Sequence, residues 1–320
     1  MKAKARAHAN IALIKYWGKR DEELHLPMNS SLSLTLDAFY TETEVEFSDE
    51  FKEDSFVLDG VEDKEDLKRV SKFLDLFREL KGTDKKASVR SENFVPTAAG
   101  LASSASGFAA LAGAANEALG LSLDRKQLSR IARRGSGSAT RSIYGGFVEW
   151  EKGESDETSF SRKIDSGDWD IGMVTVMVNK GKKKVSSREG MKRTVLTSPY
   201  YKEWVSTSFE DLVDIKKAIK ARDLESIGRI TESNALKMHA TMFTAKPPII
   251  YFEPGTIKAM EIVRELREEG IACYFTMDAG PNVKILCRFS DREMIKEKLM
   301  EAFDEDSIVI SGVGPSLSII

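Results

Sequence analysis

The chain has 320 residues, of which 41% are hydrophobic and 31% charged, and its formal net charge at pH 7 is −3. This length favours two domains of ordinary size, and no apolar run approaches the about 18 residues of a membrane span, so we expect no membrane partner. The acidic balance argues against nucleic acid as the main partner. The start, MKAKARAHAN, lacks the apolar run of a signal peptide, so we expect a cytoplasmic protein.

The first third of the chain predicts strands followed by a helix. SLSLTL (31–36) and YTETEVEF (40–47) alternate with a period of two, and an antiparallel pair of strands is the simplest interpretation. Residues 66–80 place apolar side chains at helical spacing, and Gly82 shortly afterwards is a stop signal. The segment KASVRSENF (86–94) predicts a further strand.

The middle of the chain predicts two helices and a buried strand. The run of small residues from Ala102 is compatible with a helix that ends near Gly120. LDRKQLSRIARRG predicts a second helix that closes on Gly135, with arginines in its last turn where cations suit the helix dipole. DIGMVTVMV (170–178) is typical of a buried strand.

A domain boundary is expected at the basic loop KGKKKVSSREGMKRT (180–194), which interrupts the pattern. We therefore predict an N-terminal domain at 1–183 and a C-terminal domain at 184–320. Helices and strands are mixed beyond the loop, and short turns join adjacent strands, which indicates an α+β layer structure. The elements predicted there are helices at 209–221, 224–239, 255–269 and 291–303 and the strands ACYFTM, VKILC and SIVIS.

The segment PTAAGLASSAS, which begins at Pro96, is a candidate phosphate-binding segment. Pro96 and Gly100 punctuate a loop, and Ser103, Ser104 and Ser106 fall where a helix would begin. Free amides at a helix start favour an anion, and small side chains let a phosphate approach the backbone. Runs of Ala and Gly equally indicate close helix packing. A Walker-type loop is excluded, because GxxxxGK[ST] is absent.

Three further segments carry charged groups suited to phosphate chemistry. GSGSATRSIYGG contains Arg141, whose planar guanidinium can hold a phosphate or carboxylate with two hydrogen bonds; a flexible loop with a surface arginine is the alternative. ANIALIKYWGK carries Lys15 and Lys19, although lysines on a strand edge are commonly just solvated. In TMDAGPNVK, Asp278 follows an apolar strand and either orients a hydroxyl, acts as a base, or is a structural turn residue. Together these segments indicate a phosphoryl-transfer site.

The cysteines and histidines do not predict a metal cluster. Cys273 and Cys287 flank the segment TMDAGPNVK with a spacing that fits no zinc pattern. A cytoplasmic chain rarely keeps a disulfide, so we expect two buried free thiols. The three histidines, His8, His25 and His239, are far apart in the sequence.

The pattern P-x-x-x-G-L-x-S-S-A, from Pro96 to Ala105, resembles the phosphate-binding motif of the GHMP small-molecule kinase superfamily. Within that superfamily the chain resembles the diphosphomevalonate decarboxylase family, in order and along nearly its whole length. The segments that carry this resemblance are ANIALIKYWGKRDEELHLPMNSSLSLTL, NFVPTAAGLASSASG, GSGSATRSIYGGFVEW, SSREGMKRT, NALKMHATM and CYFTMDAGPNVK. The resemblance implies a two-domain GHMP-kinase-like α+β fold, with a ribosomal protein S5 domain 2-like N-terminal domain and a ferredoxin-like C-terminal domain.

The same resemblance implies roles for individual residues. It implies that Asp278 faces the tertiary C3 hydroxyl of the substrate, that Lys15 neighbours it, and that Arg141 holds the substrate carboxylate. These three are the expected catalytic residues. The residues expected along the substrate are Tyr16, Lys19, Ser136, Gly137, Ser138, Arg141, Ser187, Arg188 and Met191. Those expected at ATP are Lys72, Ser91, Asn93, Pro96, Gly100, Leu101, Ala102, Ser103, Ser104 and Ser106, with Ser104 also the expected magnesium contact.

The implied activity is ATP-dependent decarboxylation of (R)-5-diphosphomevalonate to isopentenyl diphosphate, with release of ADP, phosphate and carbon dioxide. ATP with Mg2+ is the implied co-substrate, and a homodimer is the implied assembly. His25 departs from the family pattern, and we expect no catalytic role for it. Three alternatives stay open: a phosphomevalonate decarboxylase, a mevalonate-type kinase that does not decarboxylate, and a non-catalytic nucleotide or metabolite sensor.

Overall fold

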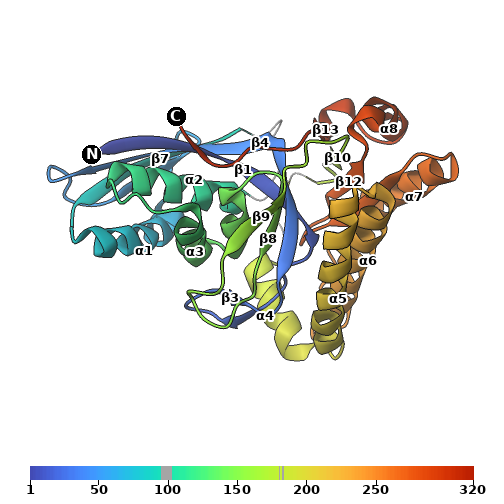
Figure 1. Ribbon diagram of the computed structural model, residues 1–320, viewed down its shortest axis with the longest axis horizontal. Coiled ribbons are helices and arrows are strands. Elements are labelled where there is room, and N and C mark those ends of the chain that lie inside the picture. Colours follow the sequence, from blue (N-terminus) through green and yellow to red (C-terminus); the bar gives the residue numbers. More distant parts are fainter. Residues whose placement is uncertain (95–102, 180, 182–183) are drawn as a thin grey trace.

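The computed structural model describes residues 1–94, 103–179, 181 and 184–320, and two large sheets organise this part of the chain (Figure 1). The strands of the larger sheet are β1 (Lys2–Ile14), β4 (Ser31–Ser48), β5 (Ser55–Leu58), β6 (Val61–Glu62), β7 (Lys86–Phe94), β8 (Phe147–Trp150), β9 (Ser161–Asp165) and β14 (Ser318–Ile319). Their order is β14-β1-β4-β7-β5-β6, and β8 joins by pairing with β4 and β9. A short hairpin of β2 (Lys19–Asp21) and β3 (Leu26–Pro27) lies apart from this sheet.

The smaller sheet has four antiparallel strands, and helices cover both of its faces. Its strands are β10 (Gly172–Val176), β11 (Cys273–Met277), β12 (Val283–Cys287) and β13 (Ile308–Ser311), in the order β11-β12-β10-β13. One face packs on α7 (Pro254–Glu268) and α8 (Arg292–Met300). The other face shares a core with α5 (Tyr201–Ala221), α6 (Leu224–Phe243) and strands of the larger sheet. Short 3-10 turns at Phe289–Asp291 and Glu305–Ser307 complete this half. These elements confirm the α+β fold and the four helices predicted beyond residue 208.

One correction concerns the antiparallel pair predicted at 31–36 and 40–47, which is wrong. Both segments belong to the single strand β4, and their common partner is β1. Residues 37–39 contain no glycine or proline to make a turn. The strand instead continues past them with a register shift between His8 and Asn10 of β1, as in a β-bulge.

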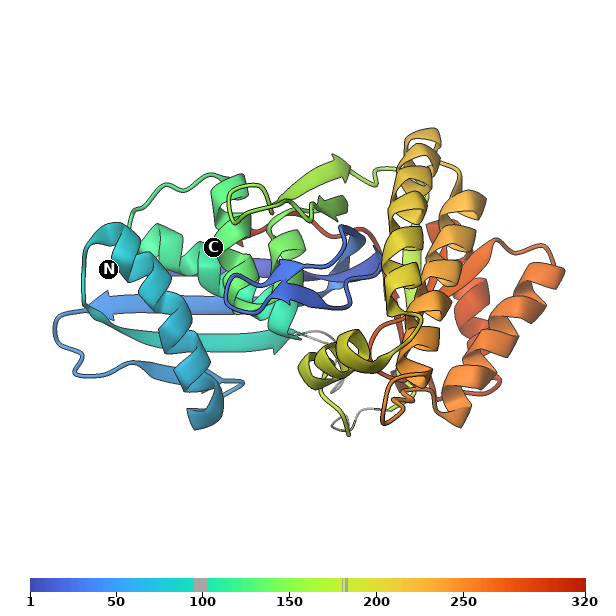
Figure 2. The same cartoon turned by 90° about the horizontal axis from the view of Figure 1, so that it is seen from below.

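The helices of the first half lie along one face of the larger sheet (Figure 2). They are α1 (Lys64–Lys81), α2 (Ser103–Ala118), α3 (Arg125–Gly135) and the 3-10 helix η1 (Gly137–Ile143). In α1 the carboxylate of Asp63 accepts the backbone N–H groups of Glu65 and Asp66, and the helix ends at Gly82 with a φ of 69°. The helical patterns recognised at 66–80, from 102 onward and at 123–135 are therefore confirmed within the described residues.

Close packing explains much of the small-residue run. Ala109, Ala112 and Ala114 of α2 are fully buried, and α2 packs against β1 and β4. A side-chain carbon placed at Gly113 would lie 2.8 Å from Cδ1 of Leu317, so even alanine would force a shift there. Larger side chains would keep the helix from its place on the sheet.

A second correction concerns the basic loop expected at 180–194. Helix α4 (Ser187–Thr197) begins inside it, because the hydroxyl of Ser186 caps the helix by accepting the backbone N–H of Glu189 at 3.2 Å. The predicted boundary between residues 183 and 184 stays a prediction. Strand β10 lies on its N-terminal side although it pairs in the smaller sheet, and the C-terminal strand β14 returns to pair with β1 (Figure 1).

The two cysteines lie opposite each other on neighbouring strands of the smaller sheet. Cys273 of β11 and Cys287 of β12 are register partners, and both are buried free thiols, which confirms the prediction. Burial raises the pKa of Cys273 to about 12, so this thiol stays protonated and unreactive. Within the described ranges, no helix is long and apolar enough to cross a bilayer.

Candidate active site

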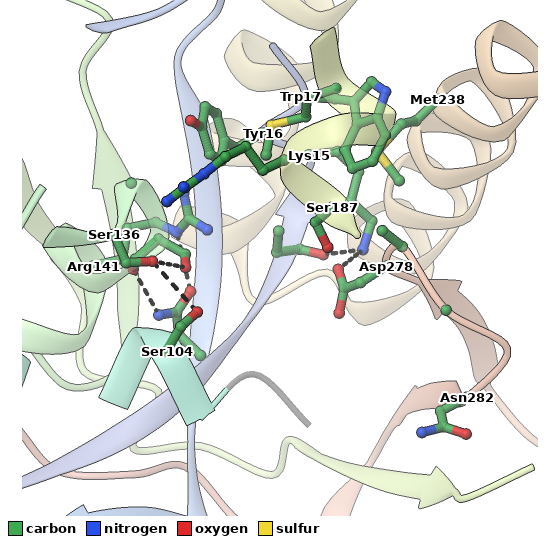
Figure 3. Close-up of a pocket in the computed structure, with 18 of the residues that line it drawn as sticks. Lys15, Tyr16, Trp17, Ser104, Ser136, Arg141, Ser187, Met238, Asp278 and Asn282 are labelled. Atoms are coloured by element: carbon green, nitrogen blue, oxygen red, sulfur yellow. Dashed lines mark hydrogen bonds and ion pairs between the residues drawn. The ribbon is translucent and has the colours of Figure 1, made fainter. Parts of the chain in front are cut away.

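A cavity of about 400 Å³ lies between the two halves of the chain, and Figure 3 shows residues that line it. Both halves contribute: β1 and η1 from the first, α4 and the turn between β11 and β12 from the second. Among the described lining residues there are one carboxylate and six lysine or arginine side chains. The carboxylate is Asp278, and the basic residues are Lys15, Lys19, Arg69, Arg141, Arg188 and Lys284. The excess of positive charge suits a ligand with several negative charges.

Asp278 is held from two sides and open on a third. It follows β11, and its carbonyl accepts the N–H of Gly280 at 2.8 Å in the turn toward β12. Its Oδ1 accepts a hydrogen bond from Nζ of Lys15 at 2.9 Å, and its Oδ2 lies 3.2 Å from Nζ of Lys284. The side chain is nevertheless 37% exposed. The carboxylate is thus fixed in place while part of it still faces the cavity.

Lys15 is anchored by main-chain and side-chain contacts. Its backbone N–H donates to Oδ1 of Asn234 on α6 at 2.8 Å, and its carbonyl accepts from Nδ2 of Asn29 at 2.9 Å. Its Nζ also donates to the carbonyl of Ala12 at 2.8 Å, and the side chain is only 1% exposed. Asn234 of α6 therefore helps to hold Lys15, which comes from the first half of the chain, beside Asp278 of the second half.

The electrostatics of this pair keep the carboxylate ionised. Burial by itself would raise the pKa of Asp278, but the charges of Lys15 and Lys284 hold it well below its ordinary value. Burial lowers the pKa of Lys15 to about 8; the charge of Asp278 opposes this effect, and those of Lys284 and Arg141 add to it. A carboxylate with so low a pKa is a weak base. Asp278 is better suited to orient a hydroxyl and to stabilise positive charge.

Arg141 is buried in η1 with part of its guanidinium free. Its Nε donates to Oδ1 of Asn10 at 3.1 Å and its Nη1 to Oγ of Ser31 at 2.5 Å. No described residue accepts a hydrogen bond from Nη2. The side chain is 2% exposed, which rules out the alternative of a surface arginine on a flexible loop. Burial lowers its pKa only to about 10, so the group stays charged and can grip a carboxylate in the cavity.

Tyr16 packs tightly between two parts of the N-terminal half. Its ring lies 4.7 Å from that of Trp150, centroid to centroid. A side-chain carbon at Gly137 would lie 2.8 Å from the same ring, so glycine is required there for space. The Tyr16 hydroxyl is buried and has no hydrogen-bond partner among the described residues. Burial raises its pKa far above the ordinary value, so it stays a neutral donor for an anion in the cavity.

Serine hydroxyls line the cavity next to these groups. Oγ of Ser136, just after α3, lies 3.3 Å from Oγ of Ser138 and donates to Oγ of Ser104 at 3.5 Å. Ser104 is in the first turn of α2 and is expected at ATP, whereas Ser136 is expected at the substrate. Their hydrogen bond therefore places the two expected binding segments next to each other. The structure also brings the remaining predicted substrate residues to this cavity: Lys19 of β2 and Ser187, Arg188 and Met191 of α4.

The residues expected at ATP do not all line a cavity. Ser91, Asn93 and Ser104 line a second cavity of about 90 Å³, together with Arg69, which also lines the first. Lys72 is exposed on α1 one turn after Arg69 and lines neither cavity. The hydroxyl of Ser106 is buried against Thr41 Oγ1 at 2.8 Å and lies outside both. The expected residues Pro96, Gly100, Leu101 and Ala102 fall outside the described residues, and Ser103 is described only as the start of α2.

Two family models match most of the chain. Residues 7–161 match the family described as the diphosphomevalonate decarboxylase-like N-terminal domain, and residues 173–313 match the mevalonate 5-diphosphate decarboxylase C-terminal domain. The chain belongs to the diphosphomevalonate decarboxylase family. The two-domain GHMP-kinase-like fold expected from the sequence is confirmed by the solved structures that resemble it.

Individual relatives are similar over nearly the whole chain. The diphosphomevalonate decarboxylase of Candida albicans is 35% identical over 322 residues, which cover 94% of this chain and 88% of the relative. A solved structure of the mevalonate diphosphate decarboxylase from Enterococcus faecalis is 53% identical, with a TM-score of 0.95, and covers 100% of this chain and 99% of its own. Another, described as MDDEF in complex with MVAPP, AMPPCP and magnesium, is 54% identical with a TM-score of 0.96 and the same coverage.

Sequence reasoning missed several residues that line the cavity of this decarboxylase family member. Arg69 was not predicted because it belongs to the amphipathic pattern of α1, where a charged residue is expected on the solvent side. Lys284 was not predicted because it lies within the apolar strand VKILC. His25 also lines the cavity, and its Nδ1 lies 2.9 Å from the carbonyl of Arg133. Burial lowers the pKa of His25 to about 4, so it is neutral near pH 7. The other missed residues include Asn10, Trp17, Met238 and Asn282.

The residues present fit a magnesium ion that arrives with a nucleotide. No group of three or more His, Cys, Asp or Glu side chains in the described part of the chain is placed to hold a metal ion. Mg2+ commonly binds substrate phosphates together with one or two protein oxygens and several waters. The exposed Ser104, in the first turn of α2 and beside the cavity, offers one such oxygen.

Proposed function

We propose that the protein catalyses the ATP-dependent decarboxylation of (R)-5-diphosphomevalonate to isopentenyl diphosphate, with release of ADP, phosphate and carbon dioxide. One observation carries the proposal: an ionised aspartate lies between two buried lysines in a cavity whose other charged residues, among those described, are cations. Family membership and the solved relative that holds MVAPP, AMPPCP and magnesium support this choice of substrates.

The chemistry follows from the substrate's tertiary C3 hydroxyl, which is a poor leaving group. The hydroxyl oxygen attacks the γ-phosphorus of ATP, ADP leaves, and the hydroxyl proton is released to water as the new O–P bond forms, so that C3 carries a phosphate ester. The C3–O bond then breaks with its electron pair on the phosphate, which leaves positive charge at C3. The C1–C2 bond pair forms the new C2–C3 double bond as carbon dioxide departs. No separate electron-sink cofactor is required, because the departing phosphate creates the electron deficiency.

Three side chains have distinct roles in this scheme. Asp278 accepts the hydrogen bond of the C3 hydroxyl and later faces the positive charge at C3, where a fixed carboxylate lowers the barrier. Lys15 holds that carboxylate. Arg141 grips the substrate carboxylate through its free amino group. Magnesium, bound with ATP and contacted by Ser104, would neutralise charge on the transferred phosphoryl group.

One assay separates the proposed activity from its alternatives. We expect diphosphomevalonate, ATP and magnesium to yield ADP, phosphate and carbon dioxide in equal amounts. ADP without carbon dioxide would indicate a kinase, and ATP binding without turnover would indicate a sensor. Phosphomevalonate in place of diphosphomevalonate tests the remaining alternative. The basic side chains Lys19 and Arg188 favour the diphosphate, so we expect a lower kcat/KM with the monophosphate.

The pH dependence of the reaction follows from the two charged partners. We expect kcat/KM to fall as the pH rises above about 8, because Lys15 then loses the proton that pairs it with Asp278. No acid limb from Asp278 is expected between about pH 5 and 8, because its pKa lies well below its ordinary value. A pH profile that is flat up to pH 10 would contradict the role given to Lys15.

Three further properties belong to the proposal. Two buried free thiols support a cytoplasmic location. We also propose a homodimer, as the family resemblance implies, and light scattering of the purified protein would measure its mass. The division into domains at 1–183 and 184–320 is proposed in the same sense, and limited proteolysis would report where the chain is cut.

A further inference from the structure

Lys284 occupies an unusual place for a charged residue. It belongs to β12, which pairs with β10 on one side and β11 on the other, so it lies in the interior of the sheet. Its neighbours Val283 and Ile285 pack in the core with α7 and α8, whereas Leu286 packs in the core shared with the larger sheet. Side chains alternate along a strand, so Lys284 lies on the same side as Leu286. It is only 3% exposed, and a buried ammonium is unfavourable unless it is paired.

The surroundings of Lys284 supply one charged partner. Directly opposite it in register lie Thr276 on β11 and Thr175 on β10, whose hydroxyls have no hydrogen-bond partner among the described residues. Its Nζ donates to the carbonyl of Asn282 at 3.4 Å and lies 3.2 Å from Oδ2 of Asp278. The contact that compensates its charge is therefore the one with the carboxylate of the active site.

The carboxylate of Asp278 is already paired with another cation, Lys15. Lys15 holds Oδ1 of Asp278 at 2.9 Å, and the guanidinium of Arg141 adds a further charge to the same cavity. From α6, the buried His239 faces the pair but is neutral, because burial lowers its pKa to about 3. Two buried lysines on one aspartate leave unbalanced positive charge, which burial makes unfavourable. Stability alone does not account for the second lysine.

We propose that Lys284 is a positioning residue for the reaction: it fixes Oδ2 of Asp278 while Lys15 fixes Oδ1, so that the carboxylate presents one ionised face to the C3 hydroxyl. This inference rests on the proposed function and deepens it. With both oxygens held, the carboxylate cannot rotate, and its negative charge is already in place when phosphate leaves C3. Charge that is in place in advance stabilises a transition state without reorganisation.

Replacing Lys284 with methionine tests the proposal by kinetics. Methionine has a similar length and suits an apolar strand, and Asp278 keeps Lys15 as its counter-charge, so we expect Tm to change little. We expect kcat to fall about 100-fold through misplacement of Asp278, with KM for both substrates nearly unchanged. Lys284→Arg keeps the charge and should restore part of kcat. Lys163→Met, at an exposed lysine of β9, is the control and should behave as the wild type.

A second readout does not depend on turnover. The charge of Lys284 contributes to the lowered pKa of Lys15, so in Lys284→Met the pKa of Lys15 rises and in Lys284→Arg it stays low. NMR titration of the Lys15 side chain in the ligand-free protein measures this change even if diphosphomevalonate is not the substrate. An unchanged Lys15 titration, an unchanged kcat, or a rise in KM alone in Lys284→Met would overturn the inference. Absence of carbon dioxide release by the wild type would overturn only the proposed function.

Discussion

Asp278→Asn should keep the fold at a lower Tm, because two buried lysines lose their carboxylate, and should lower kcat by about 10³- to 10⁴-fold. The change keeps the size and shape of the side chain but removes its charge. An amide can still meet the C3 hydroxyl, yet it offers no negative charge to the cation that forms when phosphate leaves. It also leaves Lys15 and Lys284 without their shared partner in a buried place, so the pKa of Lys15 should fall further below its ordinary value.

The measurement is single-turnover and steady-state release of ADP and carbon dioxide, with Tm recorded for the same samples. Asp214→Asn, at an exposed aspartate of α5 that pairs with Lys217, is the matched control and should keep full activity. If purified Asp278→Asn turned over substrate at close to the wild-type rate, the role proposed for the Asp278 carboxylate would be wrong.

Local sequence predicted the charged segments of this candidate site, and the resemblance to the family supplied the roles of individual residues. The stretches around Lys15, Arg141 and Asp278 each carry one or two charged residues, and those around Arg141 and Asp278 also contain glycine, which suits a phosphate pocket. Composition alone left each of them with a structural alternative. Burial excludes the solvated alternative for two of them, because Lys15 is 1% exposed and Arg141 2%. The roles of all three residues stay predictions.

The errors have physical causes that can be named. The strand pair predicted at 31–36 and 40–47 required a turn that no glycine or proline supplies, and the true partner, β1, is distant in sequence. Helix α4 carried a start signal, Ser186 followed three residues later by Glu189, but the preceding lysines obscured it.

Lys284 was missed for a different reason. In VKILC, a lone lysine among apolar residues is compatible with the solvated side of an edge strand. Its burial depends on β10, which lies more than 100 residues earlier and pairs on the other side of β12. Pairings over such separations are set by the whole fold, so the local pattern does not contain them.

Arg141→Gln should lower kcat/KM for diphosphomevalonate by about 100-fold, through both a higher KM and a lower kcat. Glutamine can replace one of the two contacts that Arg141 makes with Asn10 and Ser31, but it has no charge and no free amino group left for the substrate carboxylate. Binding weakens because a buried charge-assisted hydrogen bond is lost, and turnover falls because the carboxylate is no longer aligned with the bond that breaks.

The support given by Ser31 provides a sharper test of the same idea. Ser31→Ala removes the acceptor of Nη1 and should reduce kcat/KM less than Arg141→Gln does, because the guanidinium keeps its charge. In the double variant, the loss should be close to that of Arg141→Gln alone, since Ser31 acts through the arginine. Arg222→Gln, at an exposed arginine paired with Asp168, is the control. Additive losses in the double variant would mean that Ser31 acts on the substrate independently of Arg141. Full activity of Arg141→Gln would mean that Arg141 does not bind the substrate carboxylate.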